Sequence, residues 1–148
     1  IREHNISVVW TLHDCWPLTG HCAGFDMCGC KKWKTGCFNC EQRGTYPASK
    51  VLDNSKWNWN KKKALFTNLN LIIVTPSQWL RDNVMKSYLR DYRCEVINNG
   101  IDLNMFKPAD KCETKKLKKK YDLDARKIVL GVASEWTPKK GLLDFIEL

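Results

Sequence analysis

The sequence has no hydrophobic run long enough to cross a membrane, no internal repeat and no low-complexity segment. Its apolar runs, such as 71–74, are far shorter than the roughly 18 to 20 residues that a spanning helix needs. Hydrophobic residues make up 43% and charged residues 28% of the 148 positions, which excludes a disordered tail and a collagen-like chain. No signal peptide is visible after Ile1, and Leu148 lies inside an expected helix. We therefore expect an internal fragment of a longer protein.

Acidic residues are scarce relative to basic ones, and the formal net charge is +9. The lysines form short clusters at 31–34, 61–63 and 115–120 rather than one block. Such clusters are typical of solvated helix faces. A membrane surface, a charged substrate or a nucleic acid would also be attracted by this charge.

Cysteine is unevenly distributed. Six of the eight cysteines lie between Cys15 and Cys40, and a long stretch with an ordinary globular pattern follows them. A secreted disulfide scaffold usually spreads its cysteines over the whole domain. We therefore expect a reducing, cytoplasmic compartment and a local metal or thiol site.

The spacing of these cysteines predicts one structural zinc ion. Two residues separate Cys37 from Cys40, which allows both thiolates to reach one tetrahedral ion, and Cys22 with Cys30 would complete the set. Cys28 is the substitute for one of that second pair. Four thiolates leave no open position, so we expect no catalytic metal. Packed reduced thiols, or two disulfides in an oxidising compartment, are the alternatives. Nearby His21 could be a metal ligand, a surface residue or a residue without a role.

The periodicity of the chain predicts an α/β fold with a parallel sheet, because expected strands alternate with expected helices. The strands are expected at 7–12, 69–74, 94–97 and 127–133, and the helices at 55–66, 78–89, 113–121 and 142–148. Ser77 is the expected N-cap of the helix at 78–89. A Cys-rich loop is expected over 15–47 and a linker over 98–108.

Ligands of open parallel sheets bind at the carboxyl ends of the strands. This rule selects His13 with Asp14, the turn 75–77 and the loop 133–141 as site candidates. A strand-end histidine can act as a general base, a hydrogen-bond donor or a phosphate contact, or it can be satisfied by backbone groups. Lys140, where the last helix begins, would suit a diphosphate.

Four segments taken together resemble the family 4 retaining glycosyltransferases of the polysaccharide-biosynthesis type. They read TLHDCWPLTG at 11–20, VTPSQWL at 74–80, VINNGID at 96–102 and GVAS at 131–134, the last followed by Lys140 and Gly141. The resemblance implies two Rossmann-like domains of the GT-B type, both incomplete here, with the Cys-rich loop as an insert. Residues 1–97 would belong to the acceptor-side domain, 98–108 would be the linker, and 109–148 would begin the nucleotide-sugar-binding domain.

The resemblance also implies a function, the transfer of a hexose from a nucleotide diphosphate sugar to a saccharide or lipid-linked acceptor. His13 and Asp14 would be the catalytic residues. The donor would be bound by Lys140 and Gly141 with Ser134 and Glu135, although many members carry Arg at the position of Glu135. We expect peripheral contact with an anionic inner membrane face and no nucleic acid.

Two family motifs are missing from the chain. They are the N-terminal glycine-rich loop and the Glu-x7-Glu segment, so the resemblance implies that this fragment alone is inactive. The alternative function is a zinc-stabilised module that binds nucleic acid or another partner.

Overall fold

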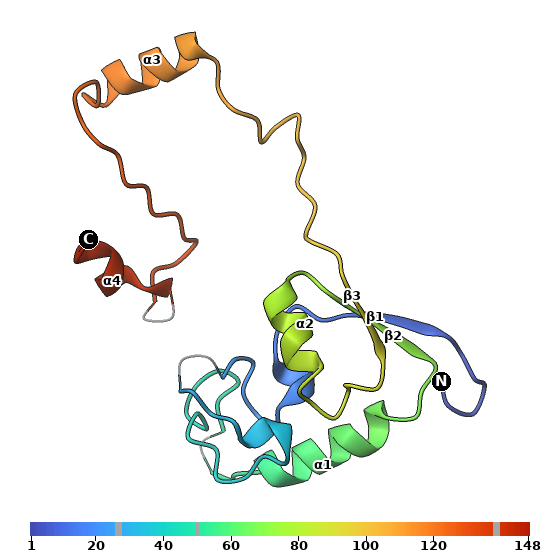
Figure 1. The fold of residues 1–148 in the computed structure, drawn as a ribbon. Helices are drawn as coiled ribbons and strands as arrows, with labels where there is room; N and C mark the ends of the chain where they lie inside the picture. Colours follow the sequence, from blue (N-terminus) through green and yellow to red (C-terminus); the bar gives the residue numbers. More distant parts are fainter. Residues whose placement is uncertain (26–27, 50, 138–139) are drawn as a thin grey trace. The chain divides into compact units, whose positions relative to one another are not determined.

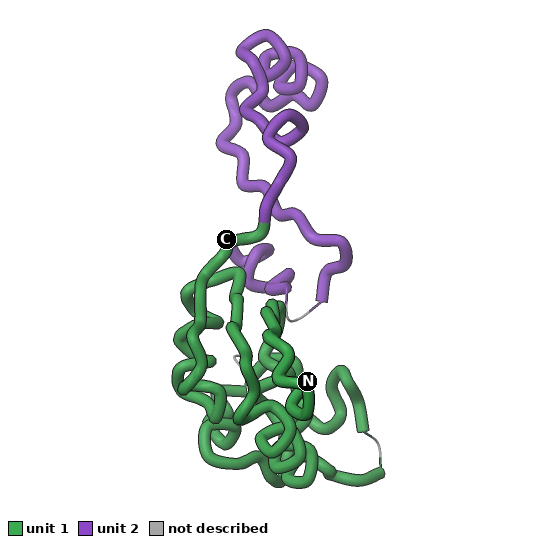
Figure 2. Tube along the Cα trace, turned by 90° about the vertical axis from the view of Figure 1, so that its right-hand side faces the viewer, with its two compact units in different colours: residues 1–99 green, residues 100–148 purple. Residues whose placement is uncertain are grey.

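The computed structural model describes residues 1–25, 28–49, 51–137 and 140–148. The chain forms two compact units, 1–99 and 100–148 (Figure 2). The first unit contains the sheet and the cysteine-rich segment, and the second contains two helices. Each unit is described by itself.

The sheet of the first unit has three parallel strands in the order β1-β2-β3 (Figure 1). Strand β1 spans Val8–Thr11, β2 spans Leu71–Thr75 and β3 spans Arg93–Val96. The central strand β2 is buried at every position except Ile72, as expected for a strand with a neighbour on both sides. The expected α/β class with a parallel sheet is therefore confirmed.

Two helices accompany the strands. Helix α1, Ser55–Phe66, has the predicted bounds and precedes β2, while α2, Gln78–Val84, joins β2 to β3. The Ser77 hydroxyl accepts a hydrogen bond from the Leu80 N–H at 3.3 Å, which confirms the expected N-cap.

Helix α2 ends at Val84, five residues before the predicted end at Leu89. The reason is local, because Ser87 bonds the backbone in place of a further helical turn. Its hydroxyl donates to the Val84 carbonyl at 2.7 Å and accepts from the Leu89 N–H at 3.0 Å. Serine competes with helical hydrogen bonds in this way.

The hydrophobic core lies between α2, the sheet and the cysteine-rich segment. Its largest fully buried apolar side chains are Leu12, Leu18, Ile73, Val84 and Leu89. At its border the Trp10 and Phe66 rings meet edge to face, with centroids 4.9 Å apart.

The second unit contains α3, Lys111–Lys120, and α4, Leu142–Ile146. The predicted strand at 127–133 is wrong, because no strand is assigned there or in any other described residue of this unit. Val132 is 84% exposed, and no neighbouring strand is present to pair with its backbone. Among the described residues of the whole chain, no helix has the length and apolarity needed to cross a membrane.

The turn after β1 is fixed to α1 by a buried lysine. This strand-end turn, residues 14–20, includes a short 3-10 helix at Trp16–Leu18. Lys62 of α1 is only 7% exposed, and its ammonium donates to the Trp16 carbonyl at 2.7 Å and to the Thr19 carbonyl at 3.0 Å. The same ammonium lies 3.3 Å from the centroid of the Trp16 ring. For Lys62, the interpretation of the lysine clusters as solvated helix faces is therefore wrong.

The backbone at Gly20 lies against the start of α1. A Cβ atom at this position would lie 2.0 Å from the Ser55 carbonyl oxygen. No residue with a side chain therefore fits at position 20 without a shift of the backbone. The Tyr88 hydroxyl, from the segment after α2, donates to the Pro17 carbonyl. The strand-end turn is therefore packed from two sides.

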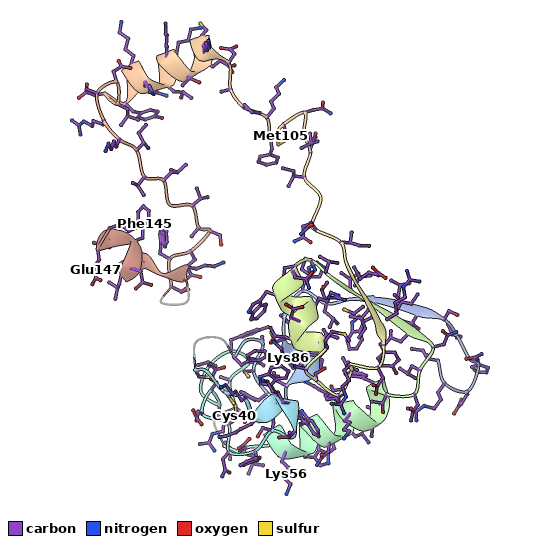
Figure 3. The ribbon with its side chains drawn as sticks, viewed as in Figure 1. Cys40, Lys56, Lys86, Met105, Phe145 and Glu147 are labelled. Atoms are coloured by element: carbon purple, nitrogen blue, oxygen red, sulfur yellow. The ribbon has the colours of Figure 1, made fainter. Side chains whose placement is uncertain are left out.

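We expect Lys62→Met to lower the free energy of unfolding by about 1 to 3 kcal/mol, because the buried Thr19 carbonyl would lose its donor. Lys56→Met is the matched control, since Lys56 is an exposed lysine of the same helix (Figure 3). Chemical denaturation of both variants measures the difference. Equal stability of the two variants would contradict a structural role for the buried ammonium.

We expect Gly20→Ala to destabilise the first unit by at least about 1 to 3 kcal/mol, because the added methyl group forces two backbone segments apart. Gly44→Ala is the control, since a Cβ atom at Gly44 meets nothing within 4 Å. Thermal unfolding followed by circular dichroism compares the two. An unchanged melting temperature for Gly20→Ala would show that the turn does not pack as described.

Candidate functional site

The first candidate site lies at the carboxyl edge of the sheet. All three strands are parallel, so the residues after Thr11, Thr75 and Val96 emerge at one edge. The ladder continues one residue further on both sides of β2, since the Leu12 N–H donates to Val74 at 2.8 Å and the Ile97 N–H to Thr75 at 2.9 Å. Side chains that follow these positions are thereby held on a rigid frame.

His13 and Asp14 follow β1 at this edge, and both are exposed. The Asp14 carboxylate accepts a hydrogen bond from the Trp16 N–H at 2.8 Å and so shapes the start of the strand-end turn. The His13 imidazole makes no hydrogen bond to the part of the chain that the structure describes. It is therefore not the backbone-satisfied histidine of the alternative interpretation, and its nitrogens are available to a ligand.

The neighbouring loops of the edge are linked to one another. The Asn98 side-chain amide donates to the Pro76 carbonyl at 2.9 Å, and the Thr75 hydroxyl donates to the Ser77 carbonyl at 3.2 Å. The Asn98 bond joins the ends of β2 and β3, and the Thr75 bond lies within the turn after β2.

The second candidate site is a small cavity inside the cysteine-rich segment, which we call the cysteine cavity. Its volume is about 20 Å³, close to what one water molecule or ion occupies. The cavity is lined by all four predicted zinc ligands, Cys22, Cys30, Cys37 and Cys40. The rest of its wall consists of His21, Phe25, Lys32, Trp33 and Phe38. The substitute ligand Cys28 does not line the cavity; its thiol donates instead to the Phe25 carbonyl at 3.4 Å.

The cysteines that line the cavity form no disulfide with any described residue. Burial, together with the neighbouring Cys40 and Cys37, raises the pKa of Cys22 to about 11. Burial is also the main cause that raises the pKa of Cys37 and of Cys40. Neutral buried thiols are weak nucleophiles, so this arrangement does not favour thiol catalysis.

Several polar groups surround the cavity. The Gly20 N–H donates to the Cys37 sulfur at 3.2 Å, and the Cys40 N–H donates to the Asp53 carboxylate at 2.8 Å. The Nε2 atom of His21 is buried without a hydrogen-bond partner. As the side chains stand, no group of three or more His, Cys, Asp or Glu residues in the described ranges could already hold a metal ion.

The predicted donor loop belongs to the second unit. Ser134, Glu135 and Lys140 are exposed, and Gly141 adopts a left-handed conformation with φ of 69° at the start of α4. The Lys140 N–H donates to the Thr137 carbonyl at 2.8 Å. Residues 138 and 139, which belong to the same predicted motif, lie outside the described residues.

Sequence reasoning missed two contributors to these sites. The first is Lys62 of α1. It lies seven residues after Ser55 and four before Phe66, so all three belong to one face of the helix. That spacing was the available signal. The second is the Gly20 N–H, and no pattern in the sequence indicates that it would meet a cysteine sulfur.

Comparison with known proteins gives one significant similarity. No protein-family model matches the chain, and no solved structure matches it. Over 108 residues, 70% of this chain, it is 39% identical to an Escherichia coli (strain K12) protein named "Putative colanic acid biosynthesis glycosyl transferase WcaC". The chain covers 26% of that relative's length. The cysteine-rich α/β chain is therefore similar to part of a protein named as a colanic acid biosynthesis glycosyl transferase.

Proposed function

We propose that the chain is part of a family 4 retaining glycosyltransferase of polysaccharide biosynthesis. It would transfer a hexose from a nucleotide diphosphate sugar to a saccharide or lipid-linked acceptor. The observation that carries the proposal is the 39% identity over 108 residues to a relative named as a colanic acid biosynthesis glycosyl transferase. The parallel sheet, with His13 exposed at its carboxyl edge, supports it.

In this proposal residues 1–97 form the acceptor-side domain of a GT-B fold, with the segment 15–47 as an insert. His13 would contact the transferred sugar or the acceptor. An exposed imidazole with no internal hydrogen bond can donate to a sugar hydroxyl or accept from it, and so orient the reacting groups. Asp14 would position His13 indirectly, since its carboxylate caps the turn that follows.

The donor would bind to residues 109–148, which follow the linker 98–108 and belong to the second unit. The exposed ammonium of Lys140 would neutralise the leaving diphosphate, which is the charge that grows in the transition state. Ser134 would contribute a hydroxyl group, and Gly141, which has no side chain, would allow the donor to come close to the backbone. Glu135 adds no positive charge, so the proposal assigns the electrostatic role to Lys140. No catalytic metal is required in this arrangement.

The basic helix α3 would be the contact with a membrane that holds a lipid-linked acceptor. Its lysines Lys119 and Lys120 are exposed. Each lysine close to an anionic surface contributes about 1 kcal/mol to binding. A cytoplasmic enzyme at the inner face of the membrane would meet both donor and acceptor there. Nucleic acid is the weaker alternative, because charge alone supports it.

The proposal predicts a strong effect of His13→Ala on sugar transfer. We expect a chimera of the E. coli relative, with this chain in place of the aligned segment, to lose about 100-fold or more in turnover when His13 is replaced. The reason is that an orienting and proton-sharing group is removed from the reacting centre. Consumption of nucleotide diphosphate sugars by a purified chimera, with the isolated chain as an inactive reference, is the measurement.

His4→Ala is the matched control, because His4 is also exposed but precedes β1 at the opposite end of that strand. It should leave turnover unchanged. A chimera that transfers sugar equally well with Ala at position 13, while both variants unfold at the same temperature, would remove His13 from the site. A chimera that folds but binds no nucleotide sugar would contradict the proposed function itself.

A further inference from the structure

We infer that the cysteine cavity is a binding site for one soft divalent metal ion, Zn²⁺, held by the thiolates of Cys22, Cys30, Cys37 and Cys40. The four sulfur-bearing side chains come from positions up to 18 residues apart in the chain, yet all of them line one cavity of about 20 Å³. Sulfur ligands in a tetrahedral set are typical of structural zinc. The inference does not depend on the proposed glycosyltransferase activity.

The cavity offers soft ligands and room for one ion. A cavity of this volume holds a single particle the size of a water molecule. Zinc–sulfur bonds of about 2.3 Å place tetrahedral sulfurs about 3.8 Å from each other. No such group is already formed among the described residues, so the ion would draw the thiols inward across the cavity.

Two nitrogens near the sulfurs can donate hydrogen bonds to thiolates. The Gly20 N–H already donates to the Cys37 sulfur at 3.2 Å, and a charged sulfur accepts such a bond more strongly. His21 Nε2 is a buried nitrogen of the cavity wall without a partner, and a thiolate would accept a hydrogen bond from it. Second-shell donors of this kind hold metal ligands in place.

Two lysines offset part of the negative charge that a bound metal site would carry. Zn²⁺ with four thiolates carries a net charge of −2, which is costly inside a protein unless cations lie nearby. The Lys62 ammonium interacts electrostatically with Cys37 and Cys22, and Lys32 with Cys30 and Cys40. Lys32 is shared with Glu41, whose carboxylate lies 3.0 Å away. Two lysines on different elements therefore flank the cysteine cavity, one at each pair of sulfurs.

Metal titration of the complete reduced chain tests the inference. We expect one Zn²⁺ per chain by elemental mass spectrometry after removal of loosely bound metal. Co²⁺ in its place should give the visible bands of a tetrahedral site and thiolate-to-cobalt charge transfer in the near ultraviolet. Alkylation read by peptide mass spectrometry should show that bound metal protects Cys22, Cys30, Cys37 and Cys40, while the exposed Cys112 stays reactive.

Matched variants separate a built site from adventitious binding. Cys28→Ser and Cys112→Ser should keep one zinc, because neither residue lines the cavity. Cys37→Ser should lose tight binding, and His21→Gln should keep the tetrathiolate spectrum with an affinity about 10- to 100-fold lower.

Three results would overturn the inference. The first is a zinc content below about one fifth of an equivalent in the folded wild-type chain. The second is metal protection of Cys112 from alkylation equal to that of the four cavity cysteines. The third is a tetrathiolate spectrum that persists in Cys37→Ser. The circular dichroism spectrum of each variant shows whether it is folded, and the protection pattern of the wild-type chain remains decisive if a variant is not. None of these readouts involves sugar transfer, so failure here leaves the proposed function intact.

Discussion

The hydrogen bonds from the Lys62 ammonium to the Trp16 and Thr19 carbonyls are the interaction on which the first unit depends most. They fix the strand-end turn to α1, and this turn separates the two candidate sites. On one side lies His13, directly after β1. On the other side lies Gly20, whose N–H reaches the Cys37 sulfur at 3.2 Å. A single buried cation therefore determines the position of both sites relative to the sheet.

Burial of that cation has a physical cost, and the structure offsets it. Removal from water lowers the pKa of Lys62 to about 8, while the nearby Cys37, Asp14 and Cys22 act in the opposite direction. Two backbone carbonyls and the face of the Trp16 ring replace the lost hydration. Thiolates in the cysteine cavity would add the negative charge that a buried ammonium favours. The buried lysine and the proposed metal site therefore stabilise each other.

Local patterns in the sequence were sufficient for most elements of the first unit. Periodicity predicted α1 at its observed bounds, and the Ser77 cap follows from a short-range hydrogen bond. The end of α2 was placed wrongly, because the Ser87 hydroxyl replaces helical bonds there. The strand expected at 127–133 does not form, since a strand requires a partner that local pattern cannot supply.

The candidate sites were predicted in part for the same reason. Spacing selected the four cysteines that line the cysteine cavity, because a Cys-x-x-Cys turn is a local feature. The role of Lys62 was missed, since its partners lie 43 and 46 residues away in the chain. Sequence spacing also favoured Cys28 as a substitute ligand, whereas the structure directs its thiol to the Phe25 carbonyl. Long-range packing decides such details.

Hydrogen exchange tests most directly whether the buried ammonium holds the strand-end turn. The Leu18 and Thr19 N–H groups donate within this turn, to Cys15 at 2.9 Å and to Trp16 at 3.3 Å. In Lys62→Met these two amides and that of Gly20 should exchange faster than in the wild-type chain, while the amides of β2 keep their protection. Unchanged exchange at all three turn amides, in a variant that has lost the ammonium, would contradict the central role given to Lys62.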